Sequence, residues 1–172
     1  MELRKQLDKI IQDNSDKNWW SDELFQGKVL PLLPKELEVL EFPPSKDKNY
    51  NCFIYTLGLS MDTNIIKDAG GFIYDIFLQK LIDEKILTYT EHPQDGDYIL
   101  YRNPQEYPGI ITHSGVLNKG KVISKWAWGP LLRHGVFDVP ASYGSDISYI
   151  KTITPKKAKE LYWGFKEFNK LP

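Results

Sequence analysis

One cysteine and one histidine in this sequence occupy positions that suit nucleophilic chemistry. Cys52, the chain's only cysteine, follows Asn51 and opens the apolar run CFIYTLGL, which predicts a short buried helix. Asparagine is a favourable N-cap, so Cys52 would lie in the first turn, where the helix dipole and free backbone N–H groups favour a thiolate. A thiol nucleophile also needs a base, and His113 lies within a predicted strand. The pattern predicts attack by Cys52 on a carbonyl carbon.

The same residues have plainer interpretations. A lone cysteine is usually an inert buried hydrophobe, and Phe, Ile, Tyr and Thr suit a strand as well as a helix. His134, in LLRHG, is expected to be a partly exposed loop histidine, with a polar role at a groove as the less favoured alternative. His92 is expected in a loop, and Asp95-Gly96-Asp97 is first of all a turn.

Composition narrows the class of protein. The chain has 172 residues, 41% hydrophobic and 26% charged, with a net charge of −1, the balance of one globular domain without a field for nucleic acid. The sequence contains no membrane-spanning run, nucleotide-binding loop or histidine–cysteine metal motif. We expect no metal, no cofactor and no nucleic-acid partner. The polar N-terminus lacks a signal-peptide pattern, which favours the cytoplasm, with export by a dedicated secretion route as the alternative.

Hydrophobic periodicity predicts the elements that must position Cys52 and His113. Helices are expected over 2–12, 52–59, 71–85 and 156–169, with one helical turn over 35–40. Strands are expected over 86–90, 97–102, 110–117, 121–128 and 146–153. Helices followed by antiparallel strands define an α+β fold. We therefore expect a single domain over 1–172, with an N-terminal covering arm (1–48), a core (49–153) and a C-terminal helix (155–170).

Three of these features together resemble a known family. The cysteine that opens a buried helix, the segment PQDGDYILY and the hairpin HSGVL-turn-KVIS are similar to the NlpC-like cysteine hydrolases. This papain-superfamily group includes the CHAP amidases and cleaves peptide and amide bonds, often in bacterial cell wall. The resemblance covers about residues 49 to 151. It implies a papain-like NlpC-type fold, Cys52 as nucleophile, His113 as base, a peptide or amide substrate and no cofactor.

In that family a polar residue on the next strand orients the histidine, more often His, Asn, Gln or Glu than Ser. Here a two-residue turn at Lys119-Gly120 would pair Leu117 with Val122 and place Ser124 diagonally from His113. A three-residue loop would instead bring Lys125 opposite His113. Ser124 is therefore the expected third catalytic residue and Lys125 the alternative.

Further expectations concern the tryptophans near the predicted site, the pKa of Cys52 and the reaction. Trp126 and Trp128 either line a substrate groove or belong to the core. The thiol of Cys52 is expected to titrate below about 8.5, the free-thiol value. The expected reaction is hydrolysis of an amide or ester through an acyl-enzyme. The alternatives are an NlpC-like scaffold reused for protein or peptide binding, and a thiol acyltransferase.

Overall fold

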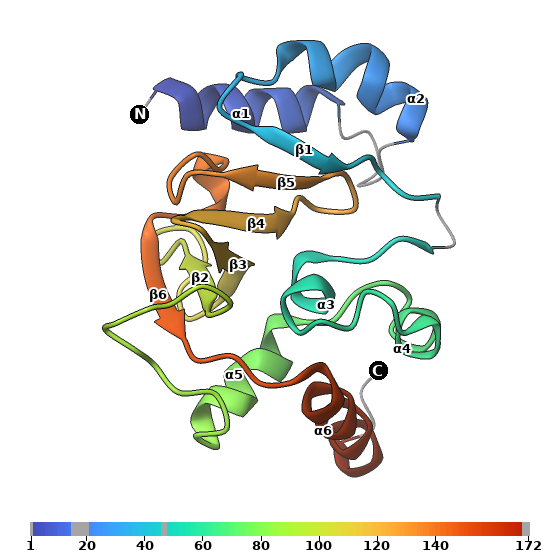
Figure 1. Cartoon of the computed structure of the whole chain (residues 1–172), viewed down its shortest axis with the longest axis vertical. Coiled ribbons are helices and arrows are strands. Elements are labelled where there is room, and N and C mark those ends of the chain that lie inside the picture. The colour runs from blue at the N-terminus through green and yellow to red at the C-terminus, as the bar shows by residue number, and fades with distance from the viewer. Residues whose placement is uncertain (1, 15–20, 46–47, 170–172) are drawn as a thin grey trace.

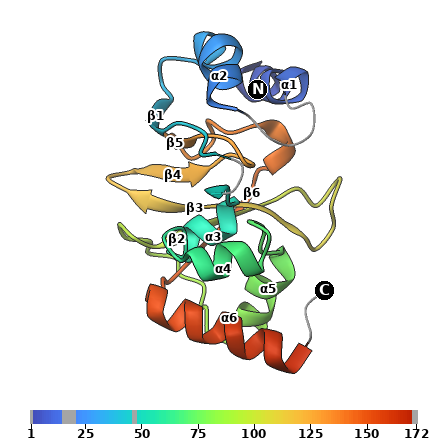
Figure 2. The ribbon, with the colours of Figure 1, turned by 90° about the vertical axis from the view of Figure 1, so that its right-hand side faces the viewer.

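A computed structural model describes residues 2–14, 21–45 and 48–169. A single sheet divides the molecule, with helices on both of its faces (Figures 1 and 2). The sheet has six strands in the order β1-β5-β4-β3-β2-β6, and every neighbouring pair is antiparallel. The strands are β1 (Glu38–Glu41), β2 (Tyr98–Arg102), β3 (Ile111–Asn118), β4 (Lys121–Lys125), β5 (Leu131–His134) and β6 (Asp146–Ile150). The expected α+β class with an antiparallel sheet is confirmed.

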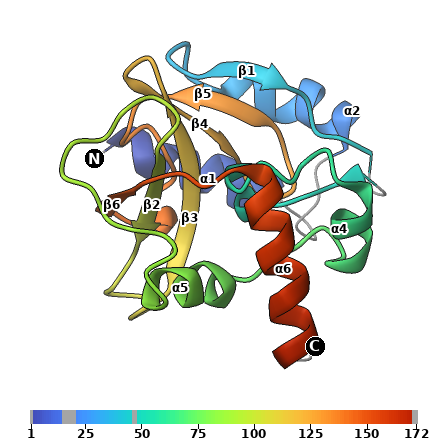
Figure 3. The same ribbon diagram turned by 60° about the horizontal axis from the view of Figure 1, so that its bottom comes forward.

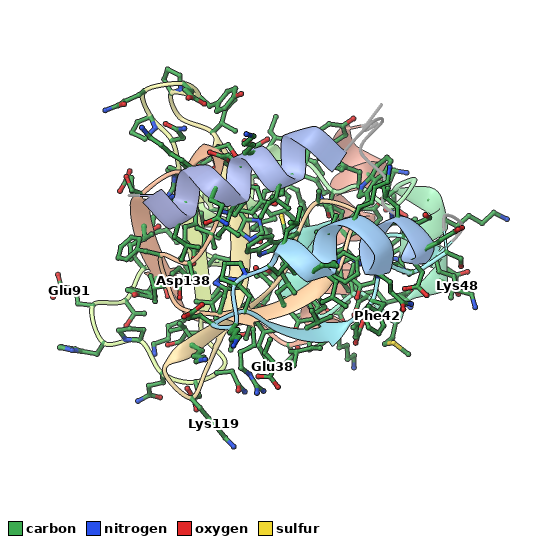
Figure 4. The ribbon with its side chains drawn as sticks, turned by 90° about the horizontal axis from the view of Figure 1, so that it is seen from above. Glu38, Phe42, Lys48, Glu91, Lys119 and Asp138 are labelled. Atoms are coloured by element: carbon green, nitrogen blue, oxygen red, sulfur yellow. The ribbon has the colours of Figure 1, made fainter. Side chains whose placement is uncertain are left out.

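The hairpin between β3 and β4 forms as predicted. Lys119 and Gly120 have φ of 50° and 73°, the left-handed values that a two-residue hairpin turn requires. Leu117 pairs with Val122 and Val116 with Ile123, so the register with a two-residue turn is correct. Lys119 projects from the tip of this hairpin in Figure 4.

Four helices cover one face of the sheet. They are α3 (Cys52–Thr56), α4 (Thr63–Asp68), α5 (Asp75–Asp83) and α6 (Pro155–Asn169), and Figure 3 shows α4, α5 and α6 together in front of the sheet. Their apolar side chains, such as Ile54, Leu78 and Tyr162, pack on Leu100 and Ile150 of the sheet. The helix expected over 71–85 begins only at Asp75, because Gly70 and Gly71 take positive φ and end α4.

The N-terminal segment covers the opposite face. It forms α1 (Glu2–Asn14), α2 (Asp22–Leu24), a π-helical turn (Phe25–Val29) and a 3₁₀ turn (Leu30–Leu32), which lie across the strands in Figure 4. Leu7 of α1 packs in a second core with Tyr101, Val122 and Trp126.

Two local expectations were wrong. The helical turn expected over 35–40 is replaced by β1, which pairs with β5 as an edge strand, so the arm completes the sheet. The short strand β5 itself was not anticipated, and of the strand expected at 86–90 only a bridge from Tyr89 to Ile150 forms.

Within the described residues no helix has the length and apolar character needed to cross a membrane.

Candidate active site

Cys52 is the first residue of α3, and the helix start around it is built by Asn51. The Asn51 Oδ1 atom accepts a hydrogen bond from the Ile54 backbone N–H at 3.2 Å, which is the predicted N-cap. The Asn51 amide nitrogen donates to the Ile73 carbonyl at 2.8 Å. Asn51 therefore fixes the start of α3 to the chain that leads into α5.

The thiol of Cys52 is buried against β3. Only 7% of the residue is exposed, and both the backbone and the side chain of Ser114 hydrogen-bond to the thiol. The Ser114 hydroxyl also lies 2.8 Å from the Thr56 hydroxyl on α3. Burial raises the pKa of Cys52 to about 11, although the bonds from Ser114 oppose the shift. This shift is opposite in direction to the expected one, a pKa below about 8.5.

His113 is buried on β3 between two aromatic rings. Its imidazole stacks on the Tyr143 ring at 4.0 Å between centroids and 19° between planes, and the Tyr101 ring lies 5.6 Å away. The Nε2 atom is buried without a hydrogen-bond partner. Burial, and to a smaller extent His134, lower the pKa of His113 well below its usual value. The ring is therefore a neutral imidazole with a free buried nitrogen.

Strand alternation separates the two neighbours His113 and Ser114. Consecutive strand residues point to opposite faces, so Ser114 faces Thr56 of α3 while His113 faces Tyr101 of β2, its cross-strand partner. In the part of the chain that the structure describes, no hydrogen bond joins Cys52 to His113 directly.

Tyr143 connects the two expected catalytic residues. Its ring stacks on His113, and its pKa is raised by burial and also by the nearby Cys52. The Ala127 backbone N–H donates to the phenol oxygen. Cys52, His113 and Tyr143, called the Cys52 cluster below, are therefore linked through Tyr143, which is itself half-buried. Tyr143 was not among the residues expected at the site, and the signal that the sequence offers is an aromatic residue directly before Gly144.

Ser124 contacts a different histidine from the one expected. Its hydroxyl lies 2.8 Å from Nε2 of His134 and accepts from the Trp126 indole N–H at 3.1 Å. The His134 Nδ1 atom lies 2.7 Å from the Gly135 carbonyl, an arrangement that fits a neutral ring with its proton on Nδ1. His134 is fully buried on β5, so the expected exposed loop histidine is wrong. Burial lowers the pKa of His134 to about 4.

Lys125, the alternative third residue, is buried on the other face of β4. Its ammonium group donates to the Gly129 carbonyl and lies 4.7 Å from the centre of the Tyr50 ring. Burial lowers the pKa of Lys125 to about 7. Neither Ser124 nor Lys125 therefore hydrogen-bonds to His113 within the described residues, and the two tyrosine rings are what hold the imidazole.

The other residues singled out from the sequence lie in the core, at the surface or in a turn. Trp126 is a core residue, 1% exposed, whereas Trp128 is only half-buried and packs edge-on against Phe72. His92 is exposed in a loop, as expected. Asp95 and Asp97 belong to the expected turn, where Asp95 accepts from the Lys119 N–H and Asp97 pairs with Lys151.

The loop that carries Tyr143 is tied to the N-terminal helix. Arg4 of α1 donates to the carbonyls of Val139, Pro140 and Gly144. Asp8 accepts from the Ser142 backbone N–H at 3.1 Å and from its hydroxyl at 2.6 Å. The arm therefore holds in place the residue that stacks on His113.

Comparison with known proteins finds no family model that matches the chain, no similar curated protein and no similar solved structure.

Proposed function

We propose that this protein is a thiol hydrolase of NlpC-like type that cleaves an amide or ester through an acyl-enzyme on Cys52. The observation that carries the proposal is the free, buried Nε2 atom of His113, whose ring stacks on Tyr143, the residue that also lies near Cys52. A buried polar atom without a partner costs about 1–3 kcal/mol. Such a cost is typical of groups kept for chemistry rather than for stability.

The reaction starts from the neutral thiol and the neutral imidazole, because burial raises the pKa of Cys52 and lowers that of His113. As the Cys52 sulfur attacks the carbonyl carbon, the thiol proton passes to Nε2 of His113, and the sulfur–carbon bond forms. The imidazolium then gives this proton to the leaving amine or alcohol as its bond to the carbonyl carbon breaks. His113 next accepts a proton from water, which attacks the thioester and releases a carboxylic acid and the free thiol.

Stacking on Tyr143 and Tyr101 orients the imidazole throughout these steps. The backbone N–H groups of Cys52 and Phe53, in the first turn of α3 and next to the sulfur, are the donors that would stabilise the oxyanion. The reaction uses only these protein groups.

A model ester tests the proposal without knowledge of the natural substrate. We expect the folded protein to hydrolyse p-nitrophenyl acetate with a burst of nitrophenol, and intact-mass spectrometry to show one acetyl group on Cys52 that turns over. Cys52→Ala should abolish the burst. His113→Gln, which fills the same space, should slow acylation by about 10²- to 10⁴-fold, the usual size of general-base catalysis.

His92→Gln is the matched control because His92 is exposed and distant in sequence from both residues. Circular dichroism of each variant establishes that it is folded. An acetyl group that stays on Cys52 without turnover, or equal acylation rates in His113→Gln and the parent protein, would overturn the proposal. Faster release on addition of a primary amine would instead identify an acyltransferase.

One observation favours a second candidate, a binding scaffold without catalysis. The thiol is 7% exposed and its pKa is raised to about 11, as for an inert buried cysteine. In that case Cys52→Ala would leave every function of the protein intact, and no acyl group would appear on Cys52.

A further inference from the structure

One surface groove opens beside the Cys52–His113–Tyr143 cluster. It has a volume of about 400 Å³ and is lined by residues of four separate segments, a size within the range of small-molecule sites, about 300–1,000 Å³. Phe53, next to Cys52, forms part of its wall, as do Thr112, next to His113, and Tyr143 itself. The groove therefore borders the candidate active site through Tyr143.

The outer walls of the groove are unusually apolar for a surface. Four large side chains lie there partly exposed, Phe72 at 37%, Tyr74 at 57%, Tyr107 at 48% and Ile110 at 43%. The Phe72 ring packs edge-on against Tyr74 at 5.0 Å and against the half-buried Trp128 at 6.5 Å. Apolar side chains gathered in one concave patch on a monomer are typical of a ligand site.

Charge narrows the kind of ligand further. Asp75 is the one charged residue among those that line the groove in the described structure, and no lining residue is a lysine or arginine. An anionic ligand would meet a carboxylate without a cation to balance its own charge. A second groove, between α5 and α6, carries Lys80, Glu84 and Glu160 but includes no residue of the Cys52 cluster.

We propose that this groove binds the acyl part of the substrate, and that the acyl part is a bulky, uncharged apolar or aromatic group. The assignment rests on the proposed hydrolase function, because it places the group next to the carbonyl that Cys52 attacks. It disfavours acidic acyl groups. Substrate choice then comes from Phe72 and Ile110, which contact the ligand, rather than from a charged side chain.

Alkylation of Cys52 by matched chloroacetamides tests the groove independently of turnover. The reagents are chloroacetamide, its N-(2-phenylethyl) derivative and its N-(2-carboxyethyl) derivative. The rate of alkylation by each reagent is measured by intact mass on folded protein and on urea-unfolded protein. Dividing the folded rate by the unfolded rate corrects for the intrinsic reactivity of the reagent. We expect the phenylethyl reagent to be favoured about tenfold or more over chloroacetamide in the folded protein, from burial of its ring. The carboxyethyl reagent should show no such gain.

Phe72→Ala and Ile110→Ala should each reduce the phenylethyl preference several-fold. Both side chains are partly exposed, so their truncation leaves the fold intact. Phe137→Ala is the matched control, because Phe137 is 49% exposed and does not line the groove. Equal preference for the three reagents, or a preference that survives both groove variants, would overturn the inference.

The outcomes separate this inference from the proposed function. Turnover of p-nitrophenyl acetate with no gain for p-nitrophenyl phenylacetate would overturn the apolar acyl site and keep the hydrolase. Phenylethyl-selective labelling without turnover of either ester would keep the groove as a ligand site and overturn the hydrolase.

Discussion

The imidazole of His113 lies against the ring of Tyr143, with 4.0 Å between centroids and 19° between planes. Histidine bases in hydrolases are more commonly oriented by a hydrogen bond to an acceptor. In the described structure His113 contacts two rings instead, because Tyr101 lies 5.6 Å away, tilted by 44°. An aromatic stack fixes the plane of the imidazole but leaves its Nε2 atom free.

Substitutions at Tyr143 should therefore separate the ring from its hydroxyl. Tyr143→Phe keeps the stack and loses only the bond from the Ala127 N–H, so we expect ester turnover within about threefold of the parent protein. Tyr143→Leu removes the stack, and kcat should fall about 10- to 100-fold, the scale of a misplaced catalytic group. NMR of His113 provides a structural readout, since the ring-current shift should persist in Tyr143→Phe and vanish in Tyr143→Leu. Equal kcat in both variants would contradict an orienting role.

Ser124→Ala should reduce stability by leaving two buried groups unpaired. The Ser124 hydroxyl bonds Nε2 of His134 and the indole N–H of Trp126. Each group left without a partner costs about 1–3 kcal/mol. Urea denaturation should show this loss, whereas Ser145→Ala, at an exposed position, should show none. An unchanged free energy of unfolding for Ser124→Ala, together with a large loss of ester turnover, would restore Ser124 as an orienting residue.

Stability should fall as the pH falls from about 6.5 towards 4. Burial lowers the pKa of His134 from 6.5 to about 4, so below pH 6.5 the unfolded chain binds a proton that the folded chain does not. The free energy of unfolding then decreases with falling pH, by about 3 kcal/mol at most from this group. His113 adds a change of the same sign.

Removal of the titrating ring tests this pH dependence. His134→Gln retains an amide that can bond Ser124 and should flatten the fall in unfolding free energy between pH 6.5 and pH 5. His92→Gln, at an exposed site, should leave it unchanged. If the free energy of unfolding fell with pH as steeply in His134→Gln as in the parent protein, His134 would not be held neutral in the folded protein.

Arg4→Met should loosen the loop of residues 139–144 although it lies in the N-terminal helix. The variant removes the bonds from Arg4 to the carbonyls of Val139, Pro140 and Gly144. We expect the unfolding free energy to fall by about 1.5–3 kcal/mol, the range for a hydrogen bond to a charged group. Lys5→Met, at an exposed position on the same helix, is the control. Equal unfolding free energies for the two variants would show that the hydrogen bonds from Arg4 to the loop do not stabilise the fold.

Local patterns were sufficient to predict some of these features. The Asn51 cap and the Lys119-Gly120 turn are each decided within a few residues, so the start of α3 and the register of β3 with β4 could be predicted from sequence. The face shared by Leu117 and Val122 follows from that register.

The partners of the buried polar groups could not be predicted in the same way. His134 reaches Ser124 only because LLRH forms a strand beside β4, and four residues without alternation give no strand signal. Thiol ionisation also depends on long-range packing, since burial by the whole fold outweighs the helix start at Cys52. Tyr143 comes from a loop, where no periodicity indicates which way a side chain points.

The contact between Arg4 and Val139 joins positions 135 residues apart, and this separation has a consequence for biosynthesis. During synthesis α1 is made well before the carbonyls that Arg4 binds, so these hydrogen bonds form only after residue 144 has been added. A product released early, just after His113, would contain the cysteine and the imidazole but not the Tyr143 ring. The contacts that hold the Tyr143 loop against α1 therefore form only after residues 139–144 have been synthesised.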